Sequence, residues 1–310
     1  MTGRQVRSNA AKQMTFIDRF WRYLHEQFWR WILGESELQR LARKCDVLDL
    51  SVQMARFRSC LALSEHLTAQ CDQIFDLKTL KVDQVSEEIA VADGIDKNNI
   101  RLMQTLRGWL HRCDYVNSVY QKLLALRDEP YASHNKVHER MLEELWTNLK
   151  PQTRRAHGRI TKEWSEIGFQ GMDPMTDFRG MGVLSLVQLL YFTSKYPVEA
   201  QALLTESNHP THWYPFSVTG INVTAFVIEL VQERLVDIKI YQYADISDPS
   251  RDVMDNGLDA IHEFYCDVFT SFNKLWKESN PEDAMAFPSI FQALKGDIRK
   301  SLQKRAFLYY

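Results

Sequence analysis

Apolar residues recur at helical spacing in nearly every long segment of this chain. The stretch 138–149 is a compact example, and its predicted inner face consists of Met141, Leu142, Leu145, Trp146 and Leu149. Only residues 238–243 alternate in the way that is typical of a strand. The pattern therefore predicts an all-α class, organised as a single compact multi-helix domain with an N-terminal helical extension packed on it.

Proline, glycine and polar clusters divide the chain into predicted helices. These helices cover residues 16–33, 37–44, 51–75, 100–127, 138–149, 183–192, 198–206, 252–278 and 281–302, with another beginning near Gly220. Ser51 is predicted as an N-cap. Because Pro130 ends a long helix, we expect a boundary there, with a helical region over 1–132 and a second domain over 133–305.

Composition excludes several classes of protein. Of the 310 residues, 25% are charged and 45% are hydrophobic, which is typical of a folded globular protein. The formal net charge of −2 gives no support for nucleic-acid binding. The five cysteines form no Cys-x-x-Cys pair, so a reducing, cytoplasmic location is expected. The polar first fifteen residues predict no signal peptide.

The segment 16–33 reads FIDRFWRYLHEQFWRWIL and predicts an amphipathic helix rich in aromatic residues. Its charged positions argue against a membrane span. Residues 1–44 contain nine Lys or Arg and four Asp or Glu, an excess that would favour an anionic surface. Two interpretations stay open: the helix packs on the rest of the protein, or it makes peripheral contact with an organelle membrane.

A search for catalytic motifs gives mostly negative results. The chain has no Gly-x-x-x-x-Gly-Lys loop for nucleotide phosphates and no Gly-x-Gly-x-x-Gly turn after a strand. His209 and His212 lie among prolines without a third metal ligand nearby, so a plain loop is the favoured interpretation. We therefore expect no metal, no cofactor and no nucleotide site in this chain.

The run from Trp164 to Gly182 is a polar, glycine-punctuated turn between apolar helical segments. Asp173 and Pro174 are typical of an N-cap followed by proline at the first helical position. The turn that they begin carries Asp177, Phe178 and Arg179, and Gly180 and Gly182 then allow a bend or a close backbone approach. The sequence thus places one arginine at the entrance of an apolar helix.

This run resembles the signature of ELMO domains, particularly of the ELMOD subfamily of GTPase-activating proteins for Arf and Arl GTPases. The resemblance extends over nearly the whole chain, although it is loose between residues 50 and 135. The matching positions are Glu37–Arg40, Trp164, Ile167–Gln170, Asp173, Pro174, Thr176–Gly182, Leu189–Phe192, Ser207–Pro210 and Gly220–Asn222.

The resemblance implies that Arg179 is a catalytic finger, which would enter the active site of a partner Arf or Arl GTPase. GTP and Mg²⁺ would then belong to the partner, and this chain would be a GTPase activator in membrane traffic rather than an enzyme with its own nucleotide site. The residues expected to support the motif or to contact the partner are Trp164, Gly168, Phe169, Gln170, Asp173, Pro174, Asp177, Phe178, Gly180 and Gly182.

Two alternatives stay open at this stage. Arg179 could form a salt bridge with Asp173 and Asp177 that only fixes the turn. The protein could also be a non-catalytic scaffold of the ELMO type, acting in small-GTPase signalling during engulfment and cytoskeletal change. The sequence favours the activator, because those scaffolds are much longer, and it does not indicate the oligomeric state.

Overall fold

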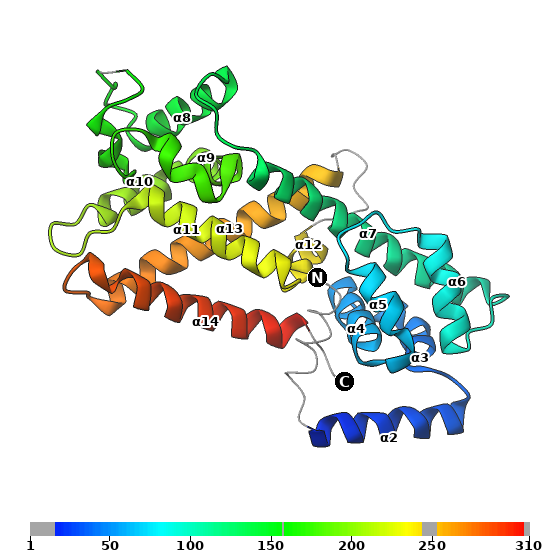
Figure 1. The fold of residues 1–310 in the computed structure, drawn as a ribbon. Helices are drawn as coiled ribbons and strands as arrows, with labels where there is room; N and C mark the ends of the chain where they lie inside the picture. Colours follow the sequence, from blue (N-terminus) through cyan, green and yellow to red (C-terminus); the bar gives the residue numbers. More distant parts are fainter. Residues whose placement is uncertain (1–15, 157, 244–252, 307–310) are drawn as a thin grey trace. The chain divides into compact units, whose positions relative to one another are not determined.

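A computed structural model describes residues 16–156, 158–243 and 253–306, and the regular structure of these residues is entirely helical (Figure 1). The α-helices are α2 (Phe16–Leu33), α3 (Glu37–Arg43), α4 (Leu50–Leu63), α5 (Thr68–Ile74), α6 (Val82–Asp93), α7 (Ile100–Asp128), α8 (Lys136–Leu149), α9 (Gly182–Lys195), α10 (Pro197–Ser207), α11 (Phe216–Gln232), α12 (Asp237–Tyr243), α13 (Val253–Ser279) and α14 (Phe287–Ala306). The predicted all-α class is confirmed. The prediction about a signal peptide concerns residues 1–15, which lie outside the described residues.

Short 3-10 helices connect several of these elements. They are η1 (Cys45–Val47), η2 (Glu65–Leu67), η3 (Lys162–Ile167), η4 (Pro174–Gly180) and η5 (Ala284–Ala286). The predicted helix over 51–75 is divided into α4, η2 and α5, because Ser64 adopts an extended conformation that ends α4. Ser51 lies inside α4, where Asp49 is the N-cap residue, so the predicted cap at Ser51 was wrong.

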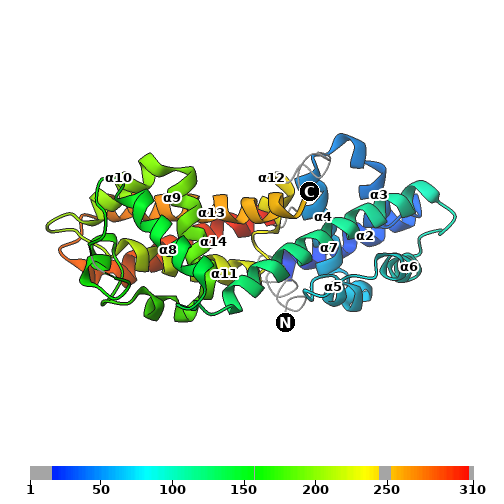
Figure 2. The same cartoon turned by 90° about the horizontal axis from the view of Figure 1, so that it is seen from above.

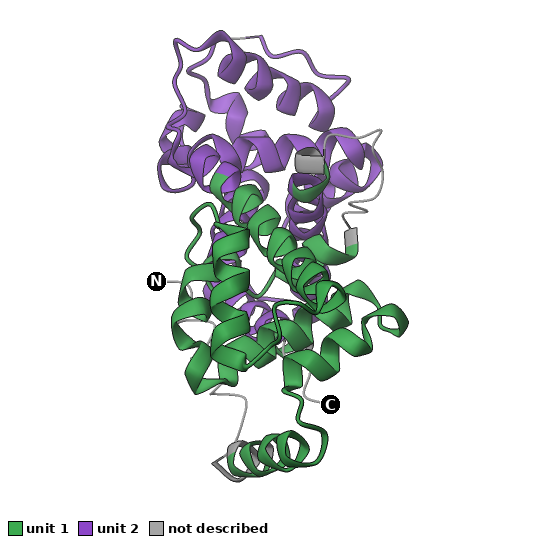
Figure 3. Ribbon diagram, turned by 90° about the vertical axis from the view of Figure 1, so that its right-hand side faces the viewer, with its two compact units in different colours: residues 1–121, 230–257, 300–310 green, residues 122–229, 258–299 purple. Residues whose placement is uncertain are grey.

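The helices form two compact units (Figure 3). Unit 1 comprises residues 1–121, 230–257 and 300–310, and unit 2 comprises residues 122–229 and 258–299. The chain passes from one unit to the other several times, so this division follows spatial contacts rather than a single cut in the sequence. The sequence-based boundary between residues 132 and 133 stays a prediction.

Unit 1 is centred on α4, which packs against α3, α5 and α12. Its interior contains an ionic cluster around Asp237, the first residue of α12. The Asp237 carboxylate lies 3.1 Å from Nε of Arg234 and 3.6 Å from Nη1 of Arg58. It also accepts a 2.6 Å hydrogen bond from the hydroxyl of Tyr120. All four side chains are buried, so the cluster fixes α12 against its neighbours through charge as well as packing.

The strand predicted over 238–243 is wrong, because these residues belong to α12. Ile238 and Ile240 alternate as they would in a strand, yet Asp237, Ile240 and Tyr241 also form an inward face at i, i+3 and i+4. No other strand is present in the described residues to pair with this segment. A helix satisfies the backbone hydrogen bonds within the segment itself, and therefore it is the stable choice here.

Unit 2 contains the elements that carry the signature. Helices α8, α9 and α10 pack on one another, and η4 packs on α9. Helices α11, α13 and α14 run beside each other in both views (Figures 1 and 2), joined by aromatic contacts of Phe291 on α14 with Phe226 and Phe272. As predicted, α9 is buried on most sides, which makes it a firm base for the turn before it.

Candidate functional site

The signature turn of unit 2 is built as η3, a short loop and η4, which leads directly into α9. Asp173 caps η4, since its carboxylate accepts a 3.0 Å hydrogen bond from the backbone N–H of Met175. Pro174 occupies the first helical position. These two features confirm the predicted start of the turn, and they define the backbone on which Arg179 is carried.

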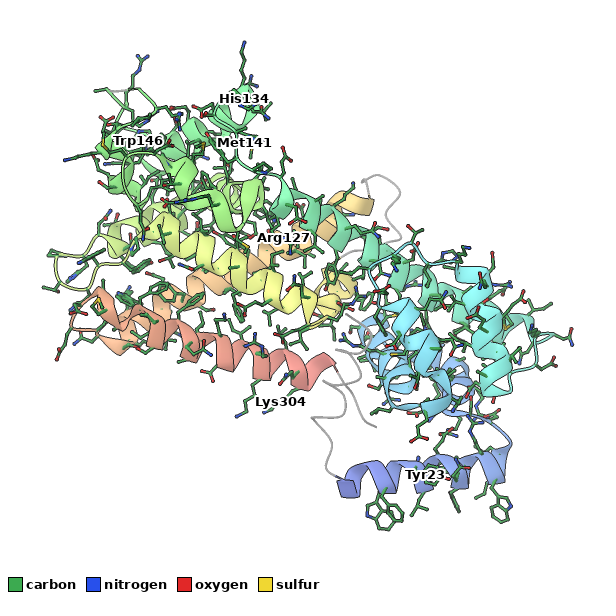
Figure 4. All side chains as sticks on the ribbon, viewed as in Figure 1. Tyr23, Arg127, His134, Met141, Trp146 and Lys304 are labelled. Atoms are coloured by element: carbon green, nitrogen blue, oxygen red, sulfur yellow. The ribbon has the colours of Figure 1, made fainter. Side chains whose placement is uncertain are left out.

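A chain of buried aromatic rings in edge-to-face contact supports the turn. Phe178 of η4 contacts Phe169 at 5.5 Å between ring centroids, and Phe169 contacts Trp164 at 6.0 Å. Trp164 in turn meets Trp146 of α8, labelled in Figure 4, at 5.7 Å. The indole N–H of Trp164 donates to the carbonyl of Arg159. The aromatic residues expected in the signature therefore form the core under the turn, which limits its movement.

Two glycines of the signature allow close backbone contacts. Gly168 has φ +81°, and a Cβ atom there would lie 2.2 Å from the backbone nitrogen of Phe216. Gly182 has φ +53°, and its Cβ would lie 2.2 Å from the carbonyl oxygen of Arg127. Gly180 is exposed, lacks a positive φ and has open space around it. The predicted close approach is thus found at Gly182 and not at Gly180.

The two aspartates of the turn have partners other than Arg179. Asp173 forms an ion pair at 2.5 Å with Nη1 of Arg159. Asp177 accepts a 2.8 Å hydrogen bond from the backbone N–H of Gln170. Burial raises the pKa of Asp177 above its ordinary value, although the Gln170 hydrogen bond and the charge of Arg179 oppose this rise. Both carboxylates hold the backbone in shape.

Arg179 is exposed near the end of η4. Its Nε donates a 2.9 Å hydrogen bond to the carbonyl oxygen of Thr176, one turn earlier. No ion pair joins Arg179 to another of the described residues, so the alternative salt bridge with Asp173 and Asp177 does not form. The bond at Nε orients the side chain, while the two Nη groups form no hydrogen bond within the described part of the chain.

Some supporting residues were missed from the sequence. Arg159 holds Asp173, and Tyr131 packs on Phe178 at 5.1 Å between ring centroids. Both residues lie outside the signature, and no local pattern marks them. Gln170, which was expected to support the motif or to contact the partner, is exposed beside the turn. The described residues contain no group of three or more His, Cys, Asp or Glu that could hold a metal ion.

Comparisons with known proteins place this chain in a family. The model of the ELMO/CED-12 family matches residues 121–291. ELMO domain-containing protein 2 of Bos taurus is 32% identical over 277 residues, which cover 88% of each chain. ELMO domain-containing protein B of Dictyostelium discoideum is 30% identical over 283 residues, covering 89% of this chain and 91% of that protein.

A shorter similarity joins the chain to ELMO domain-containing protein 1 of Homo sapiens, which is 34% identical over 213 residues, or 59% of this chain and 61% of that protein. No solved structure gives a significant match. The chain belongs to the ELMO/CED-12 family. The resemblance to ELMO domains that the signature indicated is therefore confirmed.

Proposed function

We propose that this protein is a GTPase-activating protein for small GTPases of the Arf and Arl families, and that Arg179 is the arginine finger that it inserts into the partner's active site. The observation that carries the proposal is the exposure of Arg179 on a rigid turn, without an ion pair to another described residue. A guanidinium sealed inside the protein could not reach a partner. The exposed guanidinium of Arg179 can meet a partner without a rearrangement of unit 2.

An arginine can perform this task because GTP hydrolysis spreads negative charge over the transferring phosphoryl group and the leaving oxygens. A guanidinium supplied by a second protein stabilises that charge and accelerates hydrolysis by roughly 10³–10⁵. Arginine keeps its charge and offers a planar fork of donors, which a lysine ammonium does not reproduce. In this proposal GTP and Mg²⁺ are bound by the partner, and this chain needs no cofactor.

The other residues of the signature would act by positioning Arg179. Asp173 and Asp177 fix the two ends of the loop before it, and the Thr176 carbonyl orients its side chain. Precise placement matters, because an error of about 1 Å at a reacting centre can cost two orders of magnitude in rate. Gln170 is exposed and is the residue of this set most available to contact the GTPase directly.

The proposal is tested by single-turnover GTP hydrolysis with a panel of purified Arf and Arl proteins. The native chain is compared with Arg179→Ala, Arg179→Lys and a control, Arg140→Ala, which removes another exposed arginine of unit 2. We expect both Arg179 variants to lose about 10³-fold or more of the acceleration with at least one GTPase. The control should keep it.

Binding measurements separate this function from its alternative. If Arg179→Ala binds the GTPase as tightly as the native chain but no longer accelerates hydrolysis, the residue acts in the chemical step. If the native chain binds a small GTPase without changing its rate of hydrolysis, the non-catalytic scaffold is the correct function. Equal acceleration by the native chain and both variants would refute the role of Arg179.

The proposal implies a cytoplasmic protein, acting at the surface of organelles where its partner is found.

A further inference from the structure

Helix α2 exposes a large apolar surface. Among the described residues, eight of the eighteen exposed large hydrophobic side chains lie on this helix: Phe20, Trp21, Tyr23, Leu24, Phe28, Trp31, Ile32 and Leu33. Trp31 is 82% exposed. Figure 4 shows ring side chains on the side of α2 that is turned away from the other helices of unit 1. Six of the eight, Phe20, Trp21, Leu24, Phe28, Trp31 and Ile32, lie within about 120° of one another around the helix axis. They form a contiguous patch of the kind that meets an apolar partner.

The opposite side of α2 attaches the helix to unit 1 by charge. Arg30 forms an ion pair with Asp93 of α6 at 2.6 Å, and Glu26 forms one with Arg40 of α3 at 2.7 Å. Although burial opposes it, the hydrogen bond and charge of Arg40 lower the pKa of Glu26 below its ordinary value. Since each residue turns the helix by about 100°, these contacts leave the Trp31 side facing outward.

A cationic cavity lies next to the same helix. It has a volume of about 330 Å³ and is lined by residues of α2, α3 and α4 together with Lys44. Four cations line it, Arg40, Arg43, Lys44 and Arg56, against one acid, Glu37. Arg40 and Arg43 are ion-paired, while Nε of Arg56 is buried without a hydrogen-bond partner among the described residues. This cavity can accept an anion.

We propose that α2 binds the surface of an anionic phospholipid bilayer, with its aromatic face in the interfacial layer and Lys44 and Arg56 near lipid phosphates. Tryptophan is favoured at this depth, because its ring is apolar and its N–H group stays near water. The excess of nine Lys or Arg over four Asp or Glu in residues 1–44 complements anionic lipids. None of the helices in the described residues combines the length and apolar content needed to cross a bilayer.

The charge pattern favours a bilayer over a second copy of the chain. A dimer formed through α2 would bring two cationic segments together, whereas an anionic surface attracts both the helix and the cavity. The polar attachment of α2 also leaves its apolar face open along the helix, as an interfacial helix requires. This inference is independent of the role proposed for Arg179.

The test is flotation of the purified full chain with vesicles of phosphatidylcholine containing about a third phosphatidylserine, and with vesicles of phosphatidylcholine alone. We expect binding to the anionic vesicles and weaker binding to the neutral ones. Trp31→Glu should lower the partition coefficient by about tenfold or more. Lys44→Gln and Arg56→Gln should each lower it about fivefold, and only with anionic vesicles.

Two variants serve as controls. Val91→Glu places the same new charge on α6 of unit 1, where Val91 is 70% exposed, and Trp213→Glu removes a half-exposed tryptophan from unit 2. Both should bind vesicles as the native chain does, and circular dichroism should confirm that every variant is folded. Native binding by Trp31→Glu, or the absence of vesicle binding by the native chain, would overturn the proposal. If the native chain does not bind vesicles but forms a dimer that Trp31→Glu dissociates, the aromatic face serves self-association instead.

Discussion

Alanine substitutions at three glycines of the signature separate backbone conformation from steric contact. A left-handed φ costs a residue with a side chain about 1–2 kcal/mol, and forcing packed atoms apart costs about 1–3 kcal/mol more. Gly182 incurs both costs, because its φ is +53° and a Cβ would lie 2.2 Å from the carbonyl oxygen of Arg127 and 2.4 Å from that of Glu129. We expect Gly182→Ala to lower the free energy of unfolding by about 2–5 kcal/mol.

The two other glycines are matched controls on the same segment. Gly171 has φ +70° with no atom within 4 Å of its Cβ position, so Gly171→Ala should cost only the conformational term of about 1–2 kcal/mol. Gly180 has neither a positive φ nor a neighbour within 4 Å. There alanine should stabilise the protein by about 0.4–1 kcal/mol, because it restricts the unfolded chain.

Chemical denaturation of the full chain, followed by circular dichroism, measures the free energy of unfolding of each variant relative to the native chain, with the same slope against denaturant concentration for all four proteins. The expected order of stability is Gly180→Ala, then the native chain, then Gly171→Ala, then Gly182→Ala. Equal stability of Gly182→Ala and Gly171→Ala would refute the reasoning, since it would mean that the close carbonyl contacts at Gly182 carry no cost. Destabilisation by Gly180→Ala would show that the end of η4 needs a glycine after all.

Three further predictions concern ionisable groups. Burial lowers the pKa of His262 to about 4. The unfolded chain therefore takes up a proton between about pH 6.5 and 4 that the folded protein does not, and the stability should fall over that range by at most about 3 kcal/mol. His262→Phe should remove this pH dependence in thermal melts, and an unchanged pH profile would contradict the prediction. The raised pKa of Asp177 means that folding disfavours its charged form relative to the unfolded chain. Asp177→Asn keeps an acceptor for the Gln170 N–H and should therefore be slightly more stable than the native chain at pH 7. This difference in stability should close as the pH falls through the pKa of Asp177, and a difference that widens in acid would contradict the prediction. Asp237→Asn removes the carboxylate that pairs with the buried Arg234 and should cost about 3–5 kcal/mol in denaturant unfolding, whereas a loss below about 1 kcal/mol would show that the ion pair is dispensable.

Local signals in the sequence predicted the helices well, because capping and periodicity act over a few residues. The start of η4 at Asp173 and Pro174 could be predicted for this reason, and so could the buried helix α9 that follows it. The same local signals failed over 238–243, where strand-like alternation and a helical inward face are both compatible with the residues. The choice there depends on whether partner strands exist, which is a property of the whole fold.

The environment of Arg179 could not be predicted locally, because two carboxylates lie within six residues of it in the sequence and either could have neutralised it. Within the described residues the charge of Arg179 stays unpaired because other groups of unit 2 bind these two carboxylates. Arg159 pairs with Asp173, and the Gln170 N–H binds Asp177, so both acids are occupied by groups that hold the loop. If Arg159 were lost, the Asp173 carboxylate would lose its ion-pair partner. The pairing of the acids beside Arg179 thus depends on Arg159, a residue outside the signature that no local spacing marks.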